Sequence, residues 1–178
     1  MSLIDNKLKS FRVAGNIPQW LVWIIAVCLF GIVWTAVGMW ARSTALRDLK
    51  LTPDRWDENG VLMQETNYTC VPVSIVMLLR EYGVETNTYD VALVAGTDIF
   101  GTSGAGIIRA GRHFGFDVTD KKMTFMEFTE NGESGIIQFR SNKIKHAAFI
   151  KPVSGSQMIE VKDPSQGLLF FDKDGAID

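Results

Sequence analysis

Cysteine is nearly absent from this sequence, and its scarcity limits the chemistry that the chain can carry. The 178 residues include two cysteines, Cys28 and Cys70, and Cys28 lies within a long apolar stretch. The rest of the chain therefore holds a single cysteine and cannot form an internal disulfide, which fits a reducing compartment and is compatible with an oxidising one. A lone cysteine of this kind is either a buried structural thiol or a nucleophile.

Runs of basic residues are also missing. The net charge is -2, which favours no particular partner, and the aromatic residues gather in the apolar stretch. These features predict no nucleic-acid binding. Asp172 and Asp174 resemble part of a calcium loop, but the sequence ends before the bidentate glutamate that such a loop needs. We assign no metal and no cofactor.

One long stretch, residues 20–40, has no charged residue and has a tryptophan at each end. Its 21 residues match the roughly 20 that cross the hydrocarbon core of a bilayer, and the aromatic ends suit the two interfaces. We predict a transmembrane helix at 20–40, preceded by a polar tail at 1–19. A buried core helix is an alternative. A cleaved signal peptide fits less well, because its apolar part is usually about 7–15 residues long.

Positive charges flank this stretch almost evenly. Three precede it and four follow it: Lys7, Lys9 and Arg12, then Arg42, Arg47, Lys50 and Arg55. Lysine and arginine are enriched on the cytoplasmic side of membrane proteins. The count therefore favours, by a single charge, a single-pass helix in the cell (inner) membrane with the following domain in the cytoplasm.

Small residues form a stripe along the predicted transmembrane helix, at Cys28, Gly31, Thr35 and Gly38. Such a stripe lets two helices approach closely, which allows a homodimer or a membrane-protein partner. Glycine is common in transmembrane helices in any case, so the stripe does not require a partner.

The composition becomes charged after the apolar stretch. Pro53, Asn59 and Gly60 lie in residues 41–60, so we expect a linker there whose first half continues the helix. The folded domain is expected at residues 61–178. A chain with 47% hydrophobic and 21% charged residues has room for one soluble domain plus the extra element.

Cys70 stands at the start of a predicted helix, which Gly83 ends. Pro72 fits the first turn, whose amides have no partner inside the helix. The free amides and the helix dipole stabilise an anion, so we expect the pKa of Cys70 to lie below its usual value of about 8.5. The apolar residues of the helix have the i, i+3, i+4, i+7 spacing of one buried face: Ile75, Leu78, Leu79 and Tyr82.

A cysteine nucleophile needs a base and a group that stabilises the oxyanion. Gln64, six residues before Cys70, offers a side-chain amide that can join the Cys70 backbone amide as an oxyanion hole. Of the two histidines, His146 is the better base because it opens an apolar run typical of a buried strand, whereas His113 is expected at a helix surface. A hairpin can then place Asp163 beside the imidazole, to fix its tautomer and stabilise the imidazolium.

Helices are expected in the first half of the domain and strands in the second. After the Cys70 helix the pattern predicts helices at residues 89–95 and 107–114, then strands at 135–140, 146–150, 158–161 and 168–171. Strands at such short spacing pair as an antiparallel sheet. The predicted fold class is α+β, with the nucleophile on a helix that faces the strand of His146.

The candidate residues also carry a family resemblance. The family pattern is a Gln, a Cys six residues on at the head of a helix ending in Tyr-Gly, a His that opens an apolar strand, and then Asp-Pro. Here these are Gln64, Cys70, Tyr82-Gly83, His146 before Ala-Ala-Phe-Ile, and Asp163-Pro164. Residues 63–169 thereby resemble the cysteine peptidases that process bacteriocin precursors at double-glycine leaders, best known as the N-terminal domain of peptidase-containing ABC transporters.

This resemblance implies a papain-like cysteine peptidase domain with Cys-His-Asp catalysis and a glutamine oxyanion hole. It also implies a cytosolic domain that cleaves a leader or small precursor peptide after a Gly-Gly-like site. Val71 departs from the family, which usually has glycine after the cysteine, so the backbone beside the oxyanion hole is stiffer here.

No G-x-x-x-x-G-K-[ST] motif occurs, so the sequence predicts a stand-alone, membrane-anchored peptidase and not a transporter. Two other functions stay open at this point. One is a peptidase-like module that only binds its substrate, and the other is an acyltransferase or amidase that uses the same Cys-His-Asp relay.

Overall fold

The computed structural model describes residues 18–141 and 144–172, and the chain divides into two compact units, Met1–Met39 and Trp40–Asp178. Helix α1, Gln19–Leu51, begins in the first unit and ends in the second. Most of the expected N-terminal tail, including Lys7, Lys9 and Arg12, lies outside the described residues.

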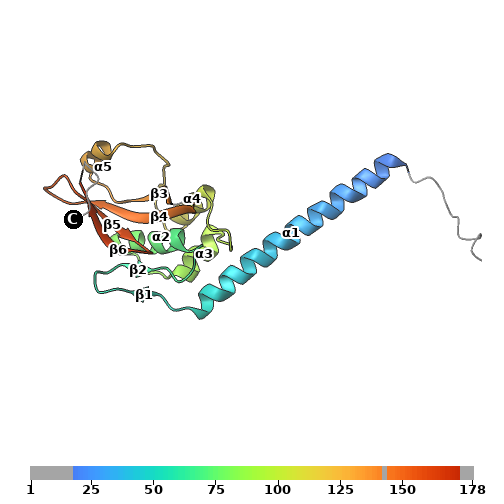
Figure 1. Cartoon of the computed structure of the whole chain (residues 1–178), viewed down its shortest axis with the longest axis horizontal. Coiled ribbons are helices and arrows are strands. Elements are labelled where there is room, and N and C mark those ends of the chain that lie inside the picture. Colours follow the sequence, from blue (N-terminus) through green and yellow to red (C-terminus); the bar gives the residue numbers. More distant parts are fainter. Residues whose placement is uncertain (1–17, 142–143, 173–178) are drawn as a thin grey trace, which may run out of the picture. The chain divides into compact units, whose positions relative to one another are not determined.

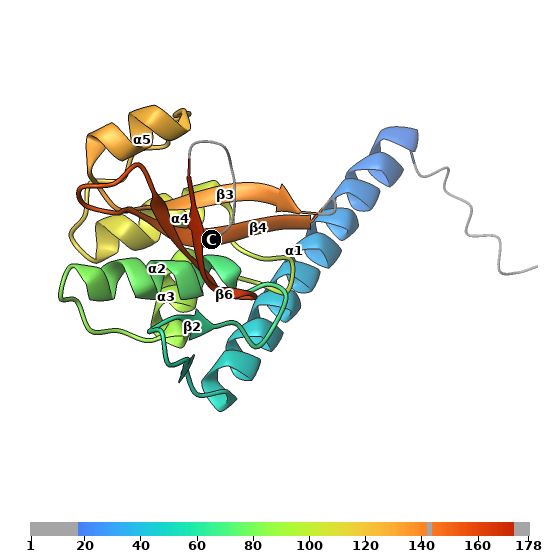
Figure 2. The same ribbon diagram turned by 60° about the vertical axis from the view of Figure 1, so that its left-hand side comes forward.

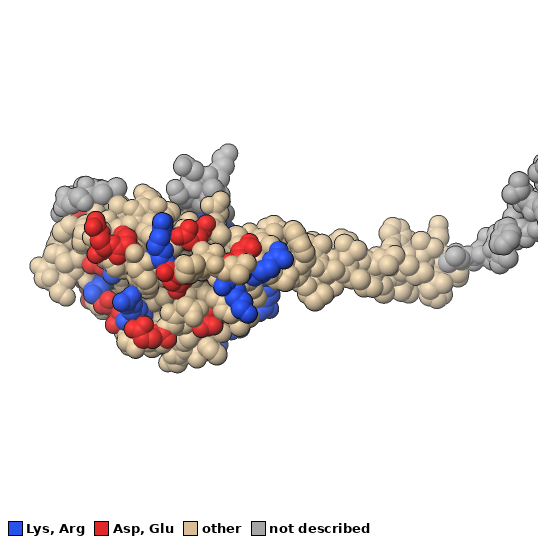
Figure 3. Space-filling view, turned by 90° about the horizontal axis from the view of Figure 1, so that it is seen from below, with Lys and Arg blue, Asp and Glu red and all other residues tan. Residues whose placement is uncertain are grey.

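The part of α1 in the first unit exposes its large apolar side chains. Trp23 and Trp34 are 71% and 70% exposed, and Figure 3 shows this part of the helix without a charged residue. Among the described residues, one helix is long and apolar enough to cross a membrane, with a mean hydropathy of 2.4, and it is α1. A signal sequence near the N-terminus would have the same features.

The last turns of α1 belong to the second unit. Ala41, Ala45 and Leu49, spaced four residues apart, are buried, and the Arg42 side chain donates a hydrogen bond to the Leu93 carbonyl at 3.0 Å. After α1, strand β1, Arg55–Trp56, pairs with β2, Leu62–Met63. Residues 41–60, where a linker is expected from the sequence, are therefore largely a helix end and a hairpin that pack within the folded unit.

Helices precede strands in the rest of the second unit (Figure 1). The helices are α2, Cys70–Glu81; α3, Thr88–Ala95; α4, Gly104–His113; and α5, Phe125–Asn131. The strands form one antiparallel sheet in the order β3-β4-β5-β6: Gly135–Ser141, Ile144–Pro152, Ile159–Asp163 and Gly167–Phe171. The predicted α+β class is confirmed.

Helix α2 lies along one face of this sheet, next to β4 (Figure 2). Its apolar residues are buried from Val71 to Leu79 with the exception of Leu78, and they share one core cluster with Ala147 and Phe149 of β4. The Ser74 hydroxyl, fully buried in the same contact, donates to the Ala147 carbonyl at 3.3 Å. This packing sets the position of Cys70 relative to the start of β4.

Helices α3 and α4 cross where α4 has a glycine. A Cβ on Gly106 would overlap the carbonyl oxygen of Ala95 and approach the Thr102 methyl group. The Arg109 side chain holds the same crossing, donating to the carbonyls of Val94 and Ala95 at 2.7 and 2.6 Å.

We therefore predict that Gly106→Ala destabilises the fold, although alanine normally favours a helix over glycine. The new methyl group meets backbone, so the two helices must separate, which costs about 1–3 kcal/mol of the free energy of unfolding. Gly104→Ala is the matched control in the same helix, because nothing lies within 4 Å of its new Cβ. Urea unfolding followed by circular dichroism measures both, and equal stability of the two variants would contradict the prediction.

Candidate active site

Cys70 is the first residue of α2, as the sequence predicts. Pro72 lies in the first turn, and the first helical hydrogen bond runs from the Val73 amide to the Thr69 carbonyl at 3.0 Å. Cys70 is 7% exposed, and its thiol lies near three backbone amides, those of Ala147, Val71 and Cys70 itself. The thiol therefore sits at a helix start and beside the residue that follows His146.

The predicted lowering of the Cys70 pKa is wrong. Burial raises the pKa of this thiol, and the negative charge of Asp163 adds to the increase. The backbone amides of Ala147, Val71 and Cys70 lower the pKa but do not offset the loss of hydration. The resting side chain is consequently a neutral thiol at neutral pH, and it needs a base before it can act as a nucleophile.

His146 and Asp163 form a direct pair. His146 lies near the start of β4, Asp163 is the last residue of β5, and the distance from Nε2 to Oδ1 is 2.9 Å. The carboxylate is buried, and the imidazole edge packs against the ring of Phe139 on β3, with ring centroids 5.3 Å apart. Because Nε2 is engaged, Nδ1 is the ring nitrogen left to exchange a proton with a neighbour.

The turn after β5 holds the Asp163 carboxylate. Oδ1 accepts hydrogen bonds from the Ser165 amide at 2.7 Å, from the Ser165 hydroxyl at 2.7 Å and from the Gln166 amide at 3.2 Å. Burial raises the pKa of Asp163, but these bonds and the contact with His146 outweigh it, so the pKa lies below its usual value. Asp163 therefore carries its charge at neutral pH.

Ser165 is a further candidate site residue, and the sequence did not lead us to predict it. Its hydroxyl lies 2.7 Å from Asp163 Oδ1 and 3.5 Å from His146 Nε2, so it touches both members of the pair. A serine two residues after an aspartate at the end of a strand is a turn signal, because short polar side chains bond to nearby backbone and side-chain groups.

Gln64 follows β2 and is tied to the Asp163 turn. Its backbone amide donates to the Pro164 carbonyl at 2.9 Å. The side-chain oxygen Oε1 is buried and has no hydrogen-bond partner among the described residues. A buried side-chain oxygen without a partner is uncommon, and rotation of the amide by half a turn would present its N–H groups at that place instead.

The structure thus brings the four candidate residues to one region through four backbone segments. Gln64 is hydrogen-bonded to the turn of Asp163, and Asp163 is hydrogen-bonded to His146. Cys70 lies near the amide of Ala147, the residue that follows His146. His113 is exposed at the end of α4, and its ring packs on Phe114. Within residues 18–141 and 144–172, no group of three His, Cys, Asp or Glu side chains is placed to hold a metal ion.

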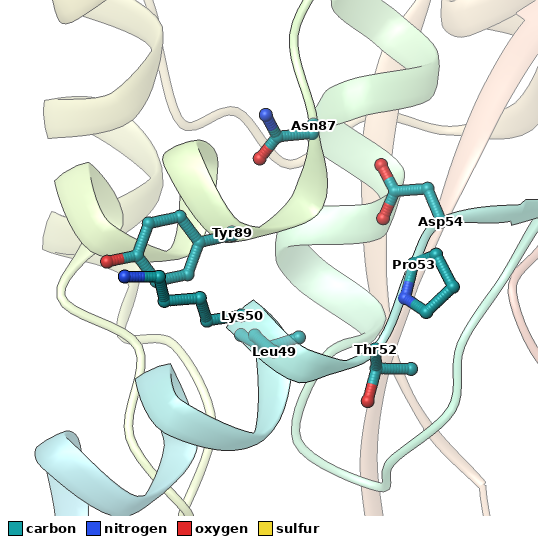
Figure 4. Close-up of a pocket in the computed structure, with 7 residues that line it drawn as sticks. All are labelled: Leu49, Lys50, Thr52, Pro53, Asp54, Asn87 and Tyr89. Atoms are coloured by element: carbon teal, nitrogen blue, oxygen red, sulfur yellow. The ribbon is translucent and has the colours of Figure 1, made fainter.

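Two surface hollows lie in the second unit. One, of about 290 Å³, is formed by the end of α1, the segment after it and the start of α3, and it contains none of the four candidate residues (Figure 4). The other, of about 380 Å³, is lined by residues next to Gln64 and to the Asp163 turn: Arg55, Trp56, Asp57, Met63, Gln166 and Gly167.

Solved structures share this fold. The peptidase domain of Streptococcus ComA, a bifunctional ABC transporter involved in a quorum-sensing pathway, superposes with a TM-score of 0.57 and 18% identity over 64% of this chain and 86% of that domain. A double-glycine-motif protease from an AMS/PCAT transporter, solved with its leader peptide, gives 0.55 and 18% over 69% of this chain and 84% of that one. The predicted papain-like fold is confirmed.

Two archaeal proteins are similar in sequence, and both are uncharacterized. The one from Methanothermobacter thermautotrophicus is 32% identical over 71 residues, which are 40% of this chain and half the length of the relative. The one from Methanothermobacter marburgensis is 26% identical over 114 residues, 64% of this chain and 78% of the relative.

Residues 58–175 match the Peptidase C39 family, which is well over half of the chain and includes all four candidate residues. This match confirms the family resemblance that was predicted from the sequence. The shared fold and the position of Cys70 at the start of a helix agree with it. The chain belongs to the Peptidase C39 family of cysteine peptidases.

Proposed function

We propose that Cys70, His146, Asp163 and Gln64 form the catalytic site of this peptidase and that it hydrolyses a peptide bond. The observation that carries the proposal is the His146–Asp163 pair: Nε2 and Oδ1 are 2.9 Å apart, Asp163 is buried, and 12% of the His146 side chain is exposed. The charge on Asp163 orients the imidazole and stabilises it once it is protonated. A buried thiol with a raised pKa is active only if such a base takes its proton.

In the proposed reaction, His146 Nδ1 removes the Cys70 proton as the sulfur attacks the carbonyl carbon of the scissile bond. The resulting oxyanion is stabilised by the Cys70 backbone amide and by the side-chain amide of Gln64. The imidazolium then donates its proton to the departing amine and the C–N bond breaks. Water, deprotonated by His146, hydrolyses the thioester and restores the thiol.

We propose that the substrate is a leader or small precursor peptide cut after a Gly-Gly-like site. The double-glycine-motif protease with the same fold was solved with a leader peptide, which supports this class of substrate. A narrow cleft selects glycine by steric rejection, because any Cβ next to the scissile bond would clash. The hollow beside Gln64 and the Asp163 turn offers space for residues that flank the bond.

We propose further that residues 20–40 anchor the peptidase in the cell membrane, with the catalytic domain in the cytoplasm. The large exposed apolar side chains of α1 support the anchor, since lipid would cover them. On the face shown in Figure 3, charges of both signs are interspersed over the second unit. The basic residues in the last turns of α1, Arg42, Arg47 and Lys50, support the cytoplasmic side.

The first activity prediction concerns Cys70 itself. The chain cleaves a leader peptide after Gly-Gly, and Cys70→Ala lowers kcat at least about a thousandfold because no other group can form the acyl intermediate. Mass spectrometry of the products measures this, and circular dichroism checks the fold of the variant. Cys28→Ser is the matched control and keeps the wild-type rate.

Three results of that experiment would contradict the proposal. Cleavage by Cys70→Ala at the wild-type rate would exclude the nucleophile. Equal cleavage of leaders with Ala-Leu in place of Gly-Gly would exclude steric selection. Transfer of the acyl group to an added amine without hydrolysis would assign an acyltransferase instead.

The second prediction concerns the pH dependence of the thiol. In a Cys28→Ser chain, the rate of Cys70 alkylation by iodoacetamide rises with pH through a midpoint above the ordinary thiol value of about 8.5, because burial favours the neutral form. The same chain in urea provides the control, and its midpoint lies at the ordinary value. Fast alkylation that persists below pH 7 in the folded chain, and disappears in His146→Ala, would instead establish a resting thiolate–imidazolium pair.

The third prediction concerns membrane orientation. Alkaline phosphatase fused after Asp178 is inactive, because that enzyme needs the oxidising exterior to form its disulfides. A fluorescent protein at the same position is bright and serves as the control for expression. An active phosphatase fusion would place the catalytic domain outside and reverse the assignment.

A further inference from the structure

The loop from Gln64 to Thr69 carries the proposed oxyanion-hole glutamine and leads into Cys70. Its first residue is bonded to Pro164, and its end is closed by bonds from the Thr69 hydroxyl and amide to the Thr66 carbonyl at 2.9 and 3.3 Å. Between these two anchors, the Tyr68 hydroxyl leaves the loop and donates to Asp48 Oδ2 at 3.1 Å. Asp48 lies 20 residues earlier in the sequence, on α1.

The α1 segment that carries Asp48 is fixed within the second unit. Ala45 and Leu49, on either side of Asp48, are buried, and the Arg42 side chain bonds to the Leu93 carbonyl on α3. The Thr52 hydroxyl bonds to the Asp48 carbonyl at 2.9 Å and closes the end of the helix. Asp48 thus lies on a packed part of α1, and the family match, which begins at residue 58, does not include it.

The half-buried Tyr68 phenol is suited to remain a donor. Burial raises its pKa and the Asp48 carboxylate raises it further, while the Thr66 hydroxyl acts in the opposite direction. The phenol therefore keeps its proton, and a hydrogen bond from it to a carboxylate is stronger than one between neutral groups.

We propose that Asp48 and Tyr68 are positioning residues that hold the Gln64–Thr69 loop in place for oxyanion stabilisation. Helix α1 would then support catalysis through its last turns, in addition to the proposed membrane attachment through residues 20–40. Oxyanion donors must lie about 2.7–3.1 Å from the developing charge, so a loop that shifts loses transition-state stabilisation with little loss of substrate binding. This inference rests on the proposed peptidase activity.

The test uses the 178-residue chain with three variants: Tyr68→Phe, Asp48→Ala and Asp48→Asn. Tyr68→Phe removes only the hydroxyl and lowers kcat roughly 10-fold while KM stays within about twofold. Asp48→Ala has the same effect. The double variant is no slower than either single variant, because each substitution removes the same hydrogen bond. Asp48→Asn keeps an acceptor oxygen and recovers most of the rate. Tyr82→Phe, which removes the hydroxyl of an exposed tyrosine, is the matched control and leaves kcat unchanged.

Two further measurements separate positioning from a general structural role. A peptide aldehyde adds to Cys70 and forms an oxyanion, so its affinity falls in Tyr68→Phe in proportion to kcat. Alkylation of Cys70 by iodoacetamide forms no oxyanion, so its rate is unchanged. Equal losses in alkylation and in aldehyde affinity would overturn the inference, since they indicate a disturbed α2.

The failure of this inference and of the proposed function are distinguishable. A wild-type chain that cleaves its leader, with Tyr68→Phe at the same kcat and the same aldehyde affinity, overturns the positioning role alone. A wild-type chain that cleaves no peptide overturns the proposed function, and the aldehyde affinities of the variants then decide the inference. Additive losses in the double variant also count against it, because they would show that the two residues act separately.

Discussion

The packing of α2 against β4 is the contact that positions Cys70 relative to the strand of His146. Ser74 and Ala147 form a buried hydrogen bond across it, and Phe149 is fully buried in the same cluster. The strand presents only a methyl group at Ala147, so the start of the helix lies close to the strand backbone, and the Cys70 thiol lies near the Ala147 amide. A larger side chain in place of Ala147 would move the Cys70 thiol away from His146, the residue that precedes Ala147.

Burial raises the pKa of the first and the last residue of the proposed relay, Cys70 and Asp163. Their charge states differ because their hydrogen bonds differ. Loss of hydration raises the pKa of Asp163 and of Cys70 alike. Ser165, Gln166 and His146 satisfy the Asp163 carboxylate, so it remains charged, whereas three backbone amides are too few to hold a thiolate on Cys70. In the proposed mechanism the negative charge lies on Asp163 at rest, and Cys70 becomes a nucleophile only when its proton moves to the imidazole of His146.

The sequence predicted the helices whose apolar spacing repeats over several turns and the strands that form a clear apolar run. The Cys70 helix, the α+β order and the strand of His146 were all readable because apolar spacing specifies which face is buried. Helix α5 was not predicted, because seven residues give little periodicity, although the capping box of Thr124 and Glu127 is a local signal for its start. The pKa of Cys70 was predicted with the wrong sign because burial by β4 comes from tertiary packing, which a local reading of the helix start does not contain.

The burial of the end of α1 was not predicted from the sequence, for a different reason. Charged residues dominate the composition after residue 40, whereas Ala41, Ala45 and Leu49 form a narrow apolar stripe that is enough for burial. The end of α1 is connected to the candidate site through the Gln64–Thr69 loop. The first residue of this loop is hydrogen-bonded to the Asp163 turn, and Tyr68 is hydrogen-bonded to Asp48 on α1. The proposed oxyanion donor Gln64 and the carboxylate of Asp163 therefore lie on hydrogen-bonded segments that also include the end of α1.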